Sequence, residues 1–137
     1  MRRPRLLVVD DHDVLRQALA ELLVQAGFDV VGEAGDGADA VAVAKRLHPD
    51  VVLLDLRMPV LSGLDAAPLI REACPDTQVV LLSAFESPAL EQQALDAGCF
   101  AYLVKGGPPG DLRLAIHRAV DSRRALLGPS GSAAVDL

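Results

Sequence analysis

The chain has 137 residues, with 13 Lys or Arg against 19 Asp or Glu, and its formal net charge at pH 7 is −6. Hydrophobic residues account for 51% of the sequence and charged residues for 23%, which indicates one ordinary globular domain rather than a disordered chain. The acidic balance argues against binding of a nucleic-acid backbone by these residues, because phosphates attract an excess of Lys and Arg.

Long apolar segments are missing from the sequence. Apolar runs such as residues 51–54 and 79–82 are far shorter than the roughly 20 residues of a membrane span. The arginines at the N-terminus are followed by too short an apolar run for a signal peptide. We therefore expect a cytoplasmic protein with no membrane association, in which Cys74 and Cys99 stay reduced and serve for packing.

Short apolar runs alternate along the chain with longer segments of helical periodicity. In chain order we predict a strand at 5–9, a helix at 14–26, a strand at 29–33, a helix at 38–47, a strand at 51–54, a helix at 66–73, a strand at 78–82, a helix at 88–97, a strand at 101–103 and a helix at 112–127. The strands lack polar alternation, which is typical of a parallel sheet covered on both faces.

Capping residues support several of these helix boundaries. Gly27 and Gly98 follow two of the helices as stop signals, and Ser87 followed by Pro88 begins another. We expect Asp65 to cap the third helix, which places Pro68 in its first turn, where a missing N–H is tolerated.

Five strand–helix units in about 127 residues imply parallel strands joined by right-handed crossovers. The expected fold is therefore α/β, an open parallel sheet with helices on both faces, and we assign residues 1–127 to this domain. Residues 128–137 are small and mostly polar, so we expect a linker or a flexible tail there.

Charged and polar side chains gather where the predicted strands end, which is where open α/β sheets bind ligands. Asp10 and Asp11 follow the first strand, Asp55 the third, Ser83 the fourth and Lys105 the fifth. With the strand order 2-1-3-4-5, the carboxylates would face one another across the crevice between strands 1 and 3. Their mutual repulsion would be relieved by Mg²⁺, which prefers oxygen ligands.

This arrangement suits phosphoryl transfer onto Asp55, because that reaction mainly needs neutralised charge and in-line positioning. Lys105 would add positive charge, and Ser83 would donate a hydrogen bond to a phosphoryl oxygen. Each residue also has a simpler interpretation. Asp11 or Asp13 could cap the next helix, Ser83 could be a turn residue, and Lys105 could be a solvated charge.

Two other motifs point to different chemistry. Residues 35–40 match the G-x-G-x-x-A fingerprint of dinucleotide binding, with an aspartate about twenty residues further on. Residues 11–14 have the D-x-D-x shape of haloacid-dehalogenase-type phosphatases. The first interpretation leaves Asp10, Asp11 and Lys105 unused, and the second lacks an acidic cluster after the lysine.

The chain resembles the response-regulator receiver domains of two-component signalling over residues 4–127. The segments that carry the resemblance are LLVVDDHDVLRQALAELL, DVVLLDLRMPVLSGLDA, VVLLSAF and AGCFAYLVK. The resemblance implies a flavodoxin-like (βα)5 fold with strand order 2-1-3-4-5. It also implies that Asp55 is the phosphoacceptor of a partner histidine kinase. The protein would then be a switch and not an enzyme, with only Mg²⁺-dependent self-phosphorylation and autodephosphorylation.

The same resemblance implies roles for the remaining site residues. Mg²⁺ would be held by Asp10, Asp11, Asp55 and the backbone carbonyl of Arg57. The residues that bind the phosphoryl group, or that act as the switch when it arrives, would be Ser83, Lys105 and Tyr102. The lifetime of the acyl phosphate would be tuned by Arg57 and Phe85, and the loop after the acceptor is matched by Pro59 and Gly63.

The segments VVDDH, LRMPVLSG and AYLVK are most similar to the LuxR/FixJ subfamily of transcription factors. That similarity implies a helix-turn-helix output domain after residues 128–137, so DNA would be bound only by a part outside this chain. We expect a homodimer through the face of the fourth helix, fifth strand and fifth helix, or through the first and fifth helices. The Gly-Gly-Pro-Pro-Gly segment after Lys105 departs from the family pattern.

Two alternatives stay open. A degenerate receiver would be a binding module controlled by a ligand or partner without phosphorylation, and a small phosphatase with an aspartate nucleophile would turn over phosphate esters. Degenerate receivers usually lack an acidic or lysine position, whereas Asp10, Asp11, Asp55 and Lys105 are all present here.

Overall fold

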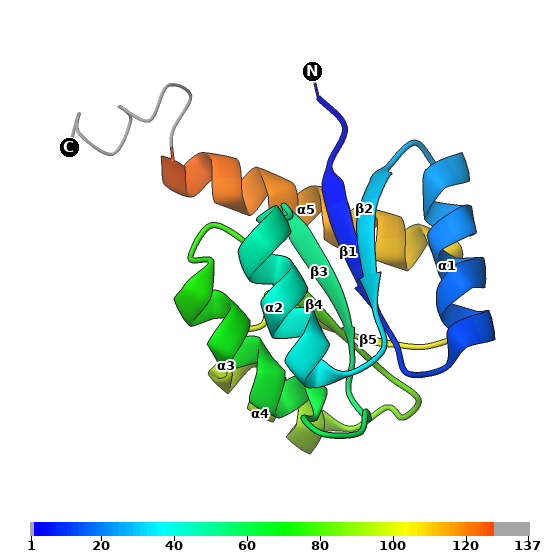
Figure 1. Ribbon diagram of the computed structural model, residues 1–137, viewed down its shortest axis with the longest axis vertical. Coiled ribbons are helices and arrows are strands. Elements are labelled where there is room, and N and C mark those ends of the chain that lie inside the picture. Colours follow the sequence, from blue (N-terminus) through cyan, green and yellow to red (C-terminus); the bar gives the residue numbers. More distant parts are fainter. Residues whose placement is uncertain (1, 128–137) are drawn as a thin grey trace.

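The structure is a computed structural model that describes residues 2–127 (Figure 1). Its elements are, in chain order, β1 Arg5–Val9, α1 Asp13–Gln25, β2 Asp29–Ala34, α2 Gly37–Leu47, β3 Val51–Asp55, α3 Gly63–Ala73, β4 Gln78–Ser83, α4 Pro88–Asp96, β5 Ala101–Val104 and α5 Pro109–Leu127. Within this part of the chain, no helix combines the length and the apolar character that a membrane crossing requires. The tail expected at 128–137 lies outside the described residues.

The five strands form one parallel sheet in the order β2-β1-β3-β4-β5, which confirms the expected flavodoxin-like fold. β2 to β5 each extend one residue past the predicted end, to Ala34, Asp55, Ser83 and Val104. These residues continue the ladder, since Asp55 is paired with Leu82 and Ser83 with Val104. The backbones of Asp55 and Ser83 are therefore positioned by the sheet itself.

Both faces of the three central strands, β1, β3 and β4, are buried, which explains why these strands lack polar alternation. Successive residues of a strand point to opposite faces. One face packs on α2, α3 and α4 through Leu7, Val9, Val52 and Leu54, and the other packs on α1 and α5 through Leu6, Val8, Val51 and Leu53. Each of these side chains is at most 1% exposed. Polar chemistry is thereby left to the edge where the strands end.

Helix α3 begins earlier than predicted. Ser62 is its N-cap and accepts the N–H of Asp65 at 3.2 Å, while the Ser62 hydroxyl donates to the Asp65 carboxylate at 3.1 Å. The expectation that Asp65 caps the helix and that Pro68 lies in its first turn is therefore wrong. Pro68 is exposed inside the helix, and the helix persists because Ala67 and Ile70 pack in the core.

The start of α4 is confirmed. Ser87 accepts the N–H of Leu90 at 3.2 Å, and Pro88 is the first helical residue. The stop signals are confirmed as well, because Gly27 and Gly98 have φ values of 96° and 94°, in the region that favours glycine.

The Gly-Gly-Pro-Pro-Gly segment extends the last helix instead of interrupting it. α5 begins at Pro109 and not at residue 112. A proline is favourable at the first helical position because the N–H there needs no helical partner. Gly106, with a φ of 78°, makes the turn between Lys105 and this helix.

Candidate functional site

Three aspartates meet at the carboxyl edge of the sheet, where β1 and β3 end side by side. Asp10 and Asp11 follow β1, and Asp55 is the last residue of β3. One carboxylate oxygen of each lies within 4.8 Å of the others. The side chains of Asp10 and Asp55 are only 8% exposed, whereas Asp11 is exposed to solvent. The cluster predicted from the strand ends is thus present in the structure.

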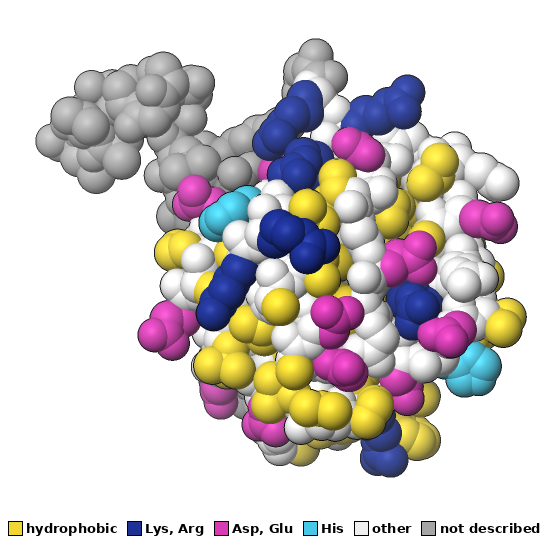
Figure 2. Space-filling model, in the orientation of Figure 1, with side chains coloured by type: hydrophobic (Ala, Val, Ile, Leu, Met, Phe, Trp, Pro, Cys, Tyr) yellow, Lys and Arg dark blue, Asp and Glu magenta, His cyan; other side chains and the backbone are white. Residues whose placement is uncertain are grey.

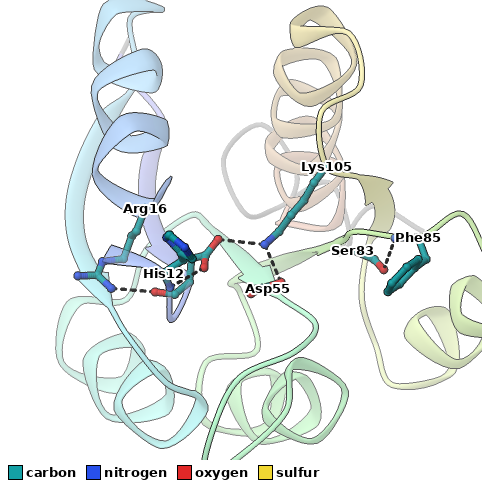
Figure 3. A network of polar contacts seen from close by, with 7 residues as sticks. His12, Arg16, Asp55, Ser83, Phe85 and Lys105 are labelled. Carbon is teal, nitrogen blue, oxygen red and sulfur yellow. Dashed lines mark hydrogen bonds and ion pairs between the residues drawn. The ribbon is translucent and has the colours of Figure 1, made fainter. Parts of the chain in front are cut away.

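Lys105 lies between two of these acids (Figure 3). Its Nζ atom is 3.0 Å from Oδ2 of Asp10 and 2.9 Å from Oδ1 of Asp55. Burial works to lower the pKa of Lys105, but its hydrogen bonds and charge interactions with Asp55 and Asp10 outweigh burial and raise that pKa. The ammonium is therefore held in its charged form, and the interpretation of Lys105 as a solvated charge is wrong.

The surroundings of Asp55 disfavour its ionised form. Burial raises the pKa of the Asp55 carboxyl above its usual value of 3.8, Lys105 lowers it, and the charges of Asp10 and Asp11 raise it further, with a net increase. A divalent cation would supply the positive charge that the site lacks. Mg²⁺ prefers carboxylate and water oxygens, so three aspartate oxygens within 4.8 Å fit this ion.

Ser83 and Tyr102 are joined through the loop between β4 and α4. The Ser83 hydroxyl accepts the N–H of Phe85 at 3.1 Å, and the Tyr102 hydroxyl donates to the Phe85 carbonyl. Both side chains are buried. Ser83 is the last residue of β4 and not a turn residue, and in this structure its hydroxyl points toward Phe85 rather than toward Asp55 (Figure 3).

Arg57 and Phe85 connect two loops at the same edge of the sheet. The Arg57 guanidinium lies over the Phe85 ring, 5.2 Å from the ring centroid. Arg57 comes from the loop after β3 and Phe85 from the loop after β4, and both are exposed. A cation over an aromatic face is attracted by the ring quadrupole, so this pair holds the two loops together beside Asp55.

The loop after Asp55 has an unusual backbone. A Cβ atom at Gly63 would lie 2.4 Å from the carbonyl oxygen of Asp55 and 3.0 Å from Cα of Leu56, so only glycine allows α3 to begin this close to the end of β3. Val60 has a φ of 70°, a region that a β-branched residue rarely adopts. The loop is therefore shaped by its tight connection to the end of β3.

The segment that matched the dinucleotide fingerprint forms a hydrogen bond between its own residues. The Asp36 carboxylate accepts the N–H of Asp39 at 2.7 Å and occupies the N-terminus of α2, where a pyrophosphate would otherwise bind. A Cβ atom at Gly37 would lie 2.1 Å from the carbonyl oxygen of Leu61. The glycines at 35 and 37 serve a tight turn and close packing, and the dinucleotide interpretation does not hold.

The phosphatase-like D-x-D pair does not share a site either. Asp13 lies in the first turn of α1 and pairs with Arg16 at 2.9 Å, while Lys105 contacts Asp10 and Asp55. The N-cap of α1 is His12, which makes no side-chain cap. The simpler interpretation of Asp11 or Asp13 as that cap is therefore also wrong.

Residues 6–117 match the family model of the response regulator receiver domain. This chain belongs to that family. Receiver domains of two-component response regulators bind Mg²⁺ at an acidic pocket, and Asp10, Asp11 and Asp55 form such a pocket here.

Relatives and solved structures agree with this assignment. The transcriptional regulatory protein PdtaR of Mycobacterium tuberculosis is 41% identical over 132 residues, which are 95% of this chain and 63% of PdtaR. The receiver chain thus spans less than two thirds of that relative's length. A LuxR-family two-component response regulator from Aurantimonas sp. SI85-9A1 has a TM-score of 0.84 at 28% identity, with 89% of this chain and 88% of that chain covered. A chain of the CheX–CheY–BeF3–Mg²⁺ complex from Borrelia burgdorferi has a TM-score of 0.78 at 26% identity, with 83% and 87% covered.

Sequence reasoning missed one residue that contacts the acidic edge of this receiver domain. Arg16 in α1 donates to the backbone carbonyl of Asp10 at 2.8 Å. The signal for this role in the sequence is a lone basic residue on α1, close after a cluster of acids, and the helical pattern of α1 explains the segment without it.

Proposed function

We propose that this receiver domain is a phosphorylation-activated switch in which Asp55 accepts a phosphoryl group from a histidine kinase. The observation that carries the proposal is the Lys105 ammonium, within 3.0 Å of both Asp10 and Asp55 at an edge with three clustered carboxylates. Such a site can neutralise the charge of an incoming phosphoryl group, which is the main requirement of this kind of transfer.

In the proposed step, a carboxylate oxygen of Asp55 attacks the phosphorus of a phosphohistidine. The new oxygen–phosphorus bond forms while the phosphorus–nitrogen bond breaks, and the released imidazole takes a proton from solvent. Lys105 contacts Oδ1 of Asp55, so the attack uses the other oxygen. When bound, Mg²⁺ would be held by Asp10, Asp11, Asp55 and the backbone carbonyl of Arg57, and would supply positive charge to the phosphoryl oxygens.

The loop after β4 is where the phosphoryl group would act on the rest of the domain. To donate to a phosphoryl oxygen, the Ser83 hydroxyl must turn away from the Phe85 N–H. Tyr102 holds the carbonyl of the same residue, so its ring would follow when this loop moves. The movement would remodel the face of α4, β5 and α5 for dimerisation or for release of an output domain.

Intact mass after incubation with acetyl phosphate, with and without Mg²⁺, tests the proposed function. We expect a Mg²⁺-dependent gain of one phosphoryl group in the wild type and none in Asp55→Asn, which keeps the size of the side chain but loses the nucleophile. Asp76→Asn, at an exposed turn, is the matched control and should label like the wild type. A labelled Asp55→Asn variant would contradict the assignment. No labelling with Mg²⁺ still bound would favour a degenerate receiver, and turnover of phosphate esters would favour a phosphatase.

We further propose that the domain controls transcription as part of a LuxR/FixJ-type regulator. Support comes from the LuxR-family protein among its structural neighbours and from a relative, named as a transcriptional regulatory protein, of which the chain spans 63%. DNA would then be bound by an output domain outside this chain, in the cytoplasm. The homodimer would form through α4, β5 and α5 or through α1 and α5.

A further inference from the structure

We propose that Arg16 is a positioning residue for the Mg²⁺ site, because it fixes the peptide group that joins two of the proposed ligands, Asp10 and Asp11. The inference rests on the proposed function, since it concerns the metal that phosphorylation of Asp55 would require. It assigns a role to a basic side chain of α1 that contacts no substrate atom and acts only through the backbone of the β1–α1 loop.

Arg16 joins three segments of the chain with one guanidinium group, and Figure 3 shows its contact with the β1–α1 loop. Its Nη1 atom donates to the carbonyl oxygen of Asp10 at 2.8 Å and lies 2.9 Å from the carboxylate of Asp13, while its Nε atom lies 3.1 Å from the carboxylate of Glu33 on β2. Its side chain is 15% exposed, against 76% for Asp13 and 38% for Glu33. Arg16 is thus the sheltered centre of the group, and a Cβ atom at Gly35 would already touch Nη1 at 3.4 Å.

The carbonyl of Asp10 belongs to the peptide group that begins Asp11. Because a peptide group is planar, holding that carbonyl also sets the direction in which the backbone of Asp11 starts. The Asp10 side chain has its own anchors, since the His12 N–H donates to Oδ1 at 2.9 Å and Lys105 contacts Oδ2 at 3.0 Å. Asp11 is exposed, so its place beside Asp10 and Asp55 depends on the backbone that Arg16 holds.

Charge and geometry give opposite expectations for this arginine. A positive charge close to three carboxylates opposes binding of a divalent cation, so a purely electrostatic role predicts tighter Mg²⁺ binding when Arg16 is removed. A positioning role predicts weaker binding, because the ligands lose their arrangement. The variant Arg16→Lys distinguishes the electrostatic role from the positioning role. Lysine keeps the positive charge, but it lacks the planar guanidinium group that donates to several acceptors at once.

Isothermal titration calorimetry of the whole chain with MgCl2 measures the deciding quantity, the Kd for Mg²⁺. We expect Arg16→Gln and Arg16→Lys each to raise the Kd about tenfold, the lower end of the range for residues that orient metal ligands. Arg118→Gln removes one charge from an exposed position on α5 and should leave the Kd unchanged. An unchanged or lower Kd in Arg16→Gln, together with a wild-type Kd in Arg16→Lys, would overturn the inference in favour of a charge effect.

A second measurement separates positioning from a loss of folding. The rate of labelling by acetyl phosphate is followed as the Mg²⁺ concentration rises, below the melting temperature of each variant. We expect half-maximal labelling of Arg16→Gln at a Mg²⁺ concentration raised by the same factor as the Kd, with the maximal rate close to that of the wild type. A lower melting temperature with an unchanged Mg²⁺ dependence would show a structural role and refute the inference. A wild-type chain that binds no Mg²⁺ would instead refute the proposed metal site itself.

Discussion

Lys105 sets the charge balance of the site, because one ammonium group faces two buried carboxylates. It contacts Oδ2 of Asp10 and Oδ1 of Asp55, and the Asp10 carboxylate also accepts the His12 N–H through its other oxygen. A Mg²⁺ ion held by these acids would give their carboxylates a second positive partner. Under the proposed function, the ammonium would hold the two carboxylates in place and would turn toward a phosphoryl group once these carboxylates have a metal partner.

Arg57 and Phe85 provide a prediction about the lifetime of the phosphorylated state. Because the guanidinium lies 5.2 Å from the centroid of the ring, the two side chains should act on the acyl phosphate as a unit. An exposed cation–π pair is worth about 0.5–1 kcal/mol, so the rate of loss from the double variant Arg57→Ala/Phe85→Ala should differ from the product of the single effects by a factor of about 2–5.

The loss of the phosphoryl group is measured by intact mass in the wild type, both single variants and the double variant after removal of the phosphodonor. Phe85→Leu serves as a control that keeps an apolar side chain but lacks the ring face, and it should resemble Phe85→Ala in its coupling to Arg57. Effects that simply multiply would show that the two side chains act independently.

The loop between β3 and α3 is the element whose geometry bears most directly on Asp55. We expect Gly63→Ala to lower the free energy of unfolding by about 1–3 kcal/mol, since the added methyl group would lie 2.4 Å from the Asp55 carbonyl oxygen and the backbone must shift to make room. Urea denaturation measures the loss. Acyl phosphate formation should slow as well, because the shift displaces the end of β3.

Gly110→Ala is the matched control for Gly63→Ala. A Cβ atom at Gly110 meets nothing within 4 Å, and alanine is the better helix former in α5. This variant should keep or slightly increase the free energy of unfolding. If both substitutions changed the free energy of unfolding equally, the close contact in the β3–α3 loop would not be the reason for glycine at position 63.

The helices and strands differ in how well their bounds could be predicted from the sequence. All five strands could be predicted from their apolar runs, and the central strands β1, β3 and β4 are buried on both faces. Four of the five strands, β2 to β5, were predicted one residue short. At β3 and β4 the missing residue is polar, Asp55 or Ser83, and it pairs with the neighbouring strand. The start of α3 was mistaken because Pro68 suggested a nearby first turn. The signal that decides it is the reciprocal pair of Ser62 and Asp65, an S-x-x-D capping pattern.

The folded molecule carries a destabilising charge at its functional site. Since the pKa of Asp55 is raised by burial and by Asp10 and Asp11, despite Lys105, its ionised form favours the unfolded chain. We expect Asp55→Asn to unfold at higher urea than the wild type in EDTA at pH 7. The difference should be complete above the raised pKa and should disappear as the pH falls below 3.8, the usual pKa of this carboxyl.

Mg²⁺ should reverse that order of stability. A ligand that binds only the folded state stabilises it in proportion to the logarithm of its concentration, and the wild type offers one more carboxylate ligand than Asp55→Asn. Asp76→Asn, an exposed substitution, should stay within about 0.5 kcal/mol of the wild type in both conditions. A less stable Asp55→Asn in EDTA would mean that the Lys105 contact outweighs the cost of burial.

Charge is distributed unevenly over the whole domain. Figure 2 shows Lys and Arg side chains gathered in the upper half of the view, near the amino ends of the strands, where Arg2 pairs with Asp50 at 3.1 Å. The acidic cluster lies at the opposite ends of the strands. Asp10, Asp11, Asp55 and Lys105 could be predicted as one site because a parallel sheet brings all strand ends to one edge. The present direction of the Ser83 hydroxyl and the role of Arg16 depend on side-chain contacts between loops, which strand order alone does not specify.

The ribosome synthesises the helices and strands in their order along the chain. Asp10, Asp11 and Asp55 are synthesised before β5, the last strand, which Lys105 follows directly. Until β5 docks on β4, the nascent domain holds three carboxylates at one edge without the ammonium that faces two of them. Lys105 is therefore the last of these residues to be synthesised, and a chain whose translation stops before β5 lacks the cation that faces Asp10 and Asp55.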